Sequence, residues 1–305
     1  MDSNKSNEIN PTNKGIINLH DVPPGLSNPS SLLWELGRPI DRISIQCNQD
    51  SLSLPKEVET LRSKIQQKKS QDFFNGPIAT INELVVDDSE LTIITALSDF
   101  YSYLASSYHF RETQGDNPVR PLAVQCAILL PGDKLLVERR VNVHDMLGKL
   151  SLFGGALSPT DLDPADAMRK ILHKKMGINT DVSQIQATGF DRDNINNIYC
   201  IFFLLKISED AARDLYSNFM NKLRAKEKIF YSVSLRQENQ FVERLLEHNE
   251  IGNWNPAGFD NLLYTLAALK LRTPEEIEEI CKNAHQRIDA LSYQYPIQAI
   301  LGDDL

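Results

Sequence analysis

The segment FGGALSPTDLDPADAMRKILHKKMGI, residues 153–178, brings together residue types that handle phosphate and metal ions. Gly154 and Gly155 end an apolar strand, and a backbone without side chains can approach a ligand closely. Asp163, followed by proline, predicts the start of a helix, and Gly177 predicts its end. This order of strand, glycine pair, loop and helix is typical of a phosphate- or metal-binding segment.

The predicted helix, residues 165–176, carries a basic face where a metal-binding helix would carry carboxylates. An apolar stripe at spacings of three and four predicts which side is buried. The other side and the last turn carry the basic residues Arg169, Lys170, His173, Lys174 and Lys175. Lysine offers a phosphate a point charge and arginine a planar fork, so this face could bind an anion directly. An ordinary solvated surface is the alternative.

Arg139 and Arg140 are two further candidates for binding a phosphate. They end the predicted strand KLLVERR, where alternation sends one side chain to each face of the sheet. The sequence leaves open whether either side chain faces a ligand or only solvent.

Four carboxylates are the candidates for a metal or catalytic role. Asp161, Asp163 and Asp166 lie in the loop and first helical turn, and Glu227 precedes the apolar segment IFYSVSL. Asp161 and Glu227 are the candidate catalytic residues, and all four are the fallback metal ligands. The aspartates also suit turns and helix caps. Because the neighbouring lysines repel a divalent cation, we expect no bound metal.

The composition of the whole chain is that of an ordinary globular protein, with 305 residues, 41% of them hydrophobic and 24% charged. A net charge of −9 disfavours nucleic acid as a partner, because a phosphate backbone requires a basic surface. The longest apolar run, YCIFFLLKI, is far shorter than the ~20 residues that span a bilayer. The N-terminus lacks the apolar core of a signal peptide. We therefore expect a cytoplasmic protein without membrane contact.

Changes in the sequence pattern divide the chain into four parts. Residues 1–30, rich in Asn, Ser, Pro and Gly, predict a flexible tail, and residues 31–118 predict a small N-terminal α+β wing. Residues 119–271 give strands followed by helices, and residues 272–305 a last helix and tail. The predicted class is α/β, of the α+β kind, with a mixed sheet clasped by helices.

The order AILLPGDKLLVERR, SLFGG, loop, helix and MGI resembles the Nudix superfamily. The signature of that family runs Gly, five residues, Glu, seven residues, then Arg-Glu-U-x-Glu-Glu-x-Gly-U, with U an aliphatic residue. Its helix glutamates lie one turn apart and hold magnesium ions that bridge a diphosphate. The resemblance implies a Nudix-like fold and a ligand of the nucleoside diphosphate class.

The signature can be placed on this chain in two registers, and neither leaves a carboxylate at the helix positions of the family's glutamates. Counting forward from Gly155, Asp161 takes the place of the first Glu. In this register the helix glutamates are replaced by Lys170, His173 and Lys174. Counting back from Gly177, they are replaced by Ile171, Lys174 and Lys175.

The stretch DFFNGPIATINELVVDDSELTIITALSDFYSYLASS is similar to the N-terminal wing of a Nudix branch that includes enzymes acting on UDP-sugars. The favoured function is a catalytically inactive Nudix-fold sensor or regulator that binds a nucleotide or a nucleoside-diphosphate-linked ligand through basic residues. One alternative is an active hydrolase of such compounds, which would need Mg²⁺, and another is a protein-interaction scaffold. No other cofactor is expected, and a homodimer or a protein partner stays open.

Overall fold

The computed structural model describes residues 15–17, 38–68, 75–113, 117–140, 148–193, 197–224, 229–235 and 254–280. Glu227 lies outside these ranges, as do most of the segments 1–30 and 272–305.

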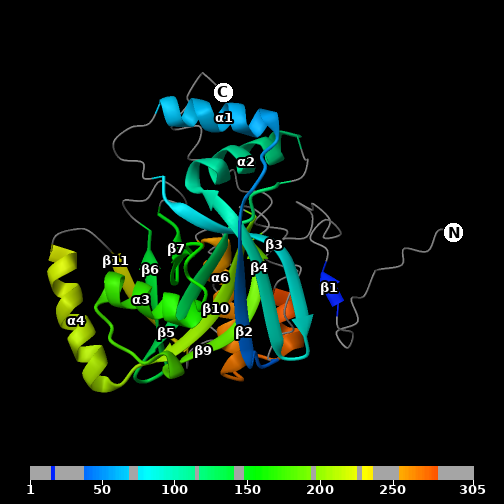
Figure 1. Ribbon diagram of the computed structural model, residues 1–305. Coiled ribbons are helices and arrows are strands. Elements are labelled where there is room, and N and C mark those ends of the chain that lie inside the picture. The colour runs from blue at the N-terminus through cyan, green and yellow to red at the C-terminus, as the bar shows by residue number, and fades with distance from the viewer. Residues whose placement is uncertain are drawn as a thin grey trace.

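The first sheet has four strands in the order β1-β3-β4-β2 (Figure 1). Its strands are β1 (Gly15–Ile17), β2 (Arg42–Ser51), β3 (Pro77–Asp87) and β4 (Glu90–Asp99). Three of them belong to the wing, whereas β1 comes from residues 1–30, so this part of the predicted flexible tail pairs with β3 instead. β3 and β4 form an antiparallel hairpin, and Asp88 in its turn has the positive φ of 43° that tight hairpin turns use. β2 joins the other edge of β4 in parallel.

Two helices, α1 (Lys56–Gln67) and α2 (Phe100–Thr113), lie together at one end of this sheet (Figure 1). They enclose a small separate apolar cluster, formed by Val58, Ile65, Tyr101, Leu104 and Ala105. The cap of α2 is Asp99, whose carboxylate accepts the N–H of Ser102 at 2.8 Å. This cap fixes the start of a helix whose first turn reaches the cavity described below.

The second sheet has seven strands along the path β11-β6-β5-β10-β9, with β7 paired to β6 and β8 to β5. Its strands are β5 (Leu122–Leu130), β6 (Lys134–Arg139), β7 (Leu150–Ser151), β8 (Phe153–Ala156), β9 (Ile185–Asp193), β10 (Ile198–Lys206) and β11 (Ile229–Ser234). β5 and β10 run parallel, whereas β6, β8 and β9 run antiparallel to their neighbours. The sheet is therefore mixed, as predicted.

Helices cover both faces of this second sheet. They are α3 (Pro164–Met176), α4 (Glu209–Arg224) and α6 (Pro256–Ala268), with a short 3-10 turn η1 (Val182–Gln184). Ile171 of α3 lies over β8, and Tyr264 of α6 contacts Phe202 of β10 on the opposite face. The α+β class with a sheet clasped by helices agrees with the prediction. In the described part of the chain, no helix is long and apolar enough to cross a membrane.

β3 joins the two sheets through backbone hydrogen bonds. The N–H of Ala79 donates to the carbonyl of Leu157, and the N–H of Ile81 donates to the carbonyl of Arg120, both at 2.8 Å. One hydrophobic cluster extends across both sheets. The two parts that the sequence pattern separates, residues 31–118 and 119–271, therefore share a core.

Candidate functional site

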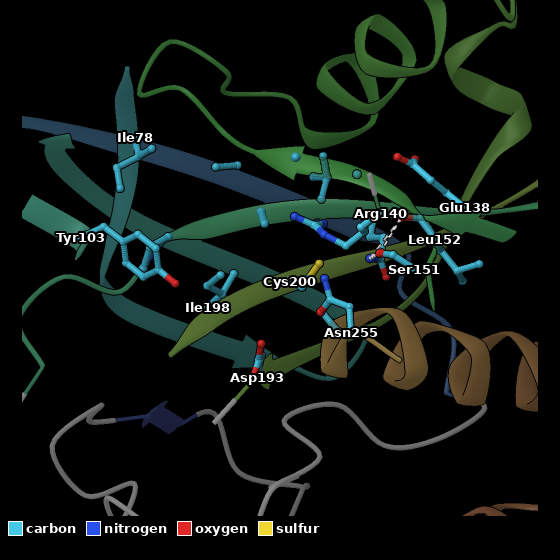
Figure 2. Close-up of a pocket in the computed structure, with 18 of the residues that line it drawn as sticks. Ile78, Tyr103, Glu138, Arg140, Ser151, Leu152, Asp193, Ile198, Cys200 and Asn255 are labelled. Carbon is cyan, nitrogen blue, oxygen red and sulfur yellow. Dashed lines mark hydrogen bonds between the residues drawn. The ribbon is translucent and has the colours of Figure 1, made fainter. Parts of the chain in front are cut away.

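A cavity of about 270 Å³ lies where the two sheets meet, beside the start of α6 (Figure 2). Its wall has three parts. One end is apolar and lies against α2, the floor is built from small side chains, and the other end is polar and lies against β6, β7 and the start of α6.

The floor exists because neighbouring strands carry small side chains at one level of the sheet. Ala123 of β5 pairs with Cys200 of β10 and with Ala156 of β8. These three residues line the cavity together with Gly155. A large side chain at this level would fill the space, so the run of small residues creates the cavity.

The apolar end of the cavity combines aromatic and aliphatic side chains. They are Ile78, Phe100, Tyr103, Pro121 and Ile198. Asp193, which is 3% exposed, lies at the same end because it pairs with Ile198 across β9 and β10. Figure 2 shows Tyr103 and Ile198 away from Arg140 at the other end. A planar group placed here would contact an aromatic ring and have one carboxylate near its edge.

The polar end of the cavity carries side chains of both charges. They are Gln125, Glu138, Arg140, Ser151, Lys175 and Asn255. The ammonium Nζ of Lys175 donates to the carbonyl oxygen of Gly154 at 2.5 Å. This contact brings a cation from the last turn of α3 to the cavity wall, where Arg140 supplies a second one.

Gln125 has one buried amide atom without a partner. Its side-chain nitrogen donates to the hydroxyl of Ser151 at 3.3 Å and to the carbonyl of Leu152 at 3.5 Å. Its amide oxygen accepts no hydrogen bond from the described residues, although the residue is only 5% exposed. Buried polar groups in proteins are nearly always paired, so this oxygen calls for an explanation.

The three aspartates before and within α3 have structural contacts. Asp161 accepts the N–H of Ser158 at 2.9 Å, and Asp163 caps the helix by accepting the N–H of Ala165 at 2.9 Å. Asp166 forms ion pairs with Arg169 and Lys170 at 2.7 and 2.8 Å. Hydrogen bonds from Lys170 and then from Arg169 lower the pKa of Asp166.

These contacts decide how well magnesium would fit. Among the described residues, no group of three His, Cys, Asp or Glu side chains is placed to hold a metal ion. The Asp163 carboxylate accepts the capping hydrogen bonds of α3, and the Asp166 carboxylate forms an ion pair with Arg169. The carbonyl oxygen of Gly154 accepts a hydrogen bond from the Lys175 ammonium. The described donor set therefore does not fit a Mg²⁺ ion bound at α3.

The predicted phosphate-binding residues divide into two groups. Those that line the cavity are Arg140, Gly154, Gly155 and Lys175. Arg169 and Lys170 pair with Asp166, and His173 and Lys174 are exposed. Arg139 points elsewhere, because its guanidinium donates to the Gly148 carbonyl at 3.0 Å and to the Tyr231 hydroxyl at 3.2 Å.

The two glycine positions of β8 differ in how strongly the packing requires a residue without a side chain. A Cβ on Gly154 would lie 2.3 Å from the carbonyl oxygen of Val124, so only glycine lets β8 lie this close to β5. A Cβ on Gly155 would meet only Ile171, at an ordinary 3.5 Å. The first glycine is thus required by strand packing, whatever ligand is bound.

A cluster of carboxylates lies beside the floor, and sequence reasoning missed it. Asp191 and Asp193 of β9 are buried and lie near Asp260 of α6. Burial, and then the charges of Asp191 and Asp193, raise the pKa of Asp260 well above its usual range. Burial and the same acids also raise the pKa of Cys200, so its thiol stays protonated. The sequence signal that could have revealed this cluster is the pair Asp191 and Asp193 within the strand segment QIQATGFDRD.

No family model matches this chain, and no curated protein matches it either. Among solved structures, a MutT/Nudix family protein from Enterococcus faecalis is similar, with a TM-score of 0.27 and 18% identity. The match covers 34% of this chain and 44% of that protein, so less than half of its length is spanned. A likeness of this extent carries no conclusion about activity, and the α+β class rests on the structure itself.

Proposed function

We propose that this protein binds an anionic ligand of nucleotide type in the cavity between its two sheets, without a divalent metal. The Lys175 ammonium, held at the cavity wall by the carbonyl of Gly154, carries the proposal. In the Nudix resemblance, counting back from Gly177 puts Lys175 at the place of a metal-binding glutamate. A side-chain cation attracts phosphate directly and repels a divalent metal, which favours a binding protein over a metal-dependent hydrolase.

The three parts of the cavity match the three parts of a nucleotide. Phe100 and Tyr103 at the apolar end offer rings against which a base can stack. The floor of small residues leaves room for a sugar. Arg140 and Lys175 at the polar end suit the phosphates. The first turn of α6, from which Asn255 lines this end, adds the positive partial charge of a helix N-terminus.

Thermal unfolding with ADP, UDP and nucleotide sugars, in EDTA and in magnesium, tests the proposal. A ligand at about 100 times its Kd stabilises a protein by about 2.7 kcal/mol, which raises Tm by roughly 5 °C. We expect such a shift to persist in EDTA. A shift that requires magnesium, with breakdown of the ligand, would instead establish the hydrolase alternative. No shift with any of these compounds would reject nucleotide binding.

The position of the phosphate can be tested by changing Lys175→Met. Loss of an ammonium that contacts a phosphate should weaken nucleotide binding about tenfold or more, as measured by calorimetry. Lys174→Met is the matched control, because Lys174 is exposed on the same turn of α3 and does not line the cavity. Equal losses in both variants would show that the general charge of the helix, and not the cavity, attracts the ligand.

A further inference from the structure

We infer that the cavity prefers a nucleotide whose phosphates are linked to a group carrying an ammonium ion, and that Glu138 accepts a hydrogen bond from this ammonium. The inference rests on the proposed function, because it assigns the part of the ligand that follows the phosphates. It makes Glu138 a residue that determines which nucleotide-linked compounds bind.

The first argument is the state of the Glu138 carboxylate. Glu138 is half-buried and lines the polar end of the cavity, where Figure 2 shows it with Arg140 and Ser151. Its carboxylate forms no ion pair and accepts no hydrogen bond within the part of the chain that the structure describes. A half-buried carboxylate gains most from a partner that is both a donor and a cation. A molecule bound in the cavity can supply that partner.

The second argument is the position of Glu138 on the side of the cavity away from the floor. In the strand order, β6 lies on one side of β5, and β10, which carries the floor residue Cys200, lies on the other. Glu138 pairs with Ser151 across β6 and β7. Neighbouring strands lie about 5 Å apart. A ligand that extends from the floor past Lys175 therefore comes within side-chain reach of Glu138 with the group beyond its phosphates.

The third argument is the charge that a phosphate brings to this end of the cavity. A phosphate bound by the Lys175 ammonium lies near the Glu138 carboxylate, which has the same sign of charge and no cation of its own in the described structure. The two anions repel, and a phosphodiester has no donor to offer the carboxylate. A hydroxyl group on the ligand would supply a donor but leave the repulsion. An ammonium supplies the donor and offsets the repulsion, so an amine-bearing ligand fits best.

The inference is tested by calorimetric titration with two pairs of compounds, in slightly acidic buffer that keeps their amines protonated. UDP-glucosamine is compared with UDP-glucose, and CDP-ethanolamine with CDP-glycerol, so that each pair sets an ammonium against a hydroxyl group. We expect the amine-bearing member of at least one pair to bind about tenfold more tightly, as a charge-assisted hydrogen bond would give.

The variant Glu138→Gln keeps the length and shape of the side chain and removes its charge. In this variant the preference for the amine should fall to about twofold or less, because the hydrogen bond is no longer charge-assisted on the side of the protein. The affinity for UDP, which brings phosphates and no ammonium, should rise because the repulsion is gone. A variant that merely disturbs the fold would weaken every ligand. An unchanged preference would overturn the assignment of Glu138.

Glu83→Gln is the matched control for this variant. Glu83 is also a half-buried strand glutamate without an ion pair or hydrogen bond in the described structure, but it lies on β3 and does not line the cavity. Its variant should keep the wild-type preference.

Two results with the wild-type protein would overturn the inference and leave nucleotide binding intact. One is equal or tighter binding of the hydroxyl-bearing member in both pairs. The other is binding of ADP or UDP when none of the four linked compounds binds. Absence of binding by all of these compounds would overturn the proposed function together with the inference.

Discussion

α3 and α6 begin alike in sequence and differently in structure. Asp163 and Asn255 are their N-cap residues, and each is followed by proline. The Asp163 carboxylate accepts the N–H groups of Ala165 and Asp166, whereas Asn255 makes no side-chain capping bond and lines the cavity. The start of α3, where the sequence suggested phosphate chemistry, is therefore satisfied by its own aspartate, and the start of α6 faces the candidate ligand site.

This difference teaches that a helix start becomes a binding site through what lies beside it. α3 instead contributes to the cavity from its last turn, through Lys175. A lysine there is also favoured by the negative end of the helix dipole. The same loop–helix pattern thus has a structural end and a candidate binding end, and the cap variants below test that division.

The largest expected effect comes from Gly154→Ala in β8. The added methyl would lie 2.3 Å from the carbonyl of Val124, so β8 must move away from β5. We expect the free energy of unfolding in urea to fall by about 3 kcal/mol. Gly155→Ala, with only a 3.5 Å contact, should lose less than about 1 kcal/mol. Similar losses in the two variants would show that close strand packing is not what distinguishes these glycines.

A smaller effect is expected from removing the two helix caps. Asp163→Ala should lower the free energy of unfolding by about 1 kcal/mol, because two N–H groups lose their acceptor. Asn255→Ala should lower it by only roughly 0.5 kcal/mol or less, because no capping bond is lost. Its effect should appear in nucleotide affinity instead. A larger stability loss for Asn255→Ala than for Asp163→Ala would reverse the comparison.

The last change, at Asp260, should alter how the stability of the fold depends on pH. Because the pKa of Asp260 is raised in the folded protein, protonation of this carboxyl stabilises the fold at acidic pH. This stabilisation is lost as pH rises above about 3.9, the usual pKa of aspartate, and through the raised pKa of Asp260 in the folded protein. Asp260→Asn removes the titrating group, so its stability relative to wild type should increase with pH. A constant difference in Tm between pH 4 and pH 8 would show that Asp260 ionises like an exposed aspartate.

The elements that the sequence predicts well are those with local signals. β5 and β10 have continuous apolar runs, and α3 has an aspartate cap and Gly177 in a left-handed C-cap with φ of 73°. The apolar strand predicted to end at Gly154 and Gly155 divides at Leu152 into β7 and β8. The reason is tertiary, because β7 pairs with β6 while β8 pairs with β5.

The candidate site was predicted only in part. Lys175 and the glycine pair were identified because they lie in one contiguous motif. Gln125, Asp193 and Asn255 come from three other elements and carry no motif of their own. Their meeting depends on strand pairing across β5, β10 and β9 and on the packing of α6, which no local pattern encodes.

The sequence by itself determined the class of fold, the order of the elements and the basic character of α3. Those features follow from periodicity, caps and residue type, which act over a few residues. Only the tertiary structure decided which charges reach a cavity: Arg140 and Lys175 line it, and Arg139 and Arg169 do not. The physical reason is that a cavity forms where strands distant in sequence place small side chains at one level, and that register is fixed by pairing across the whole sheet.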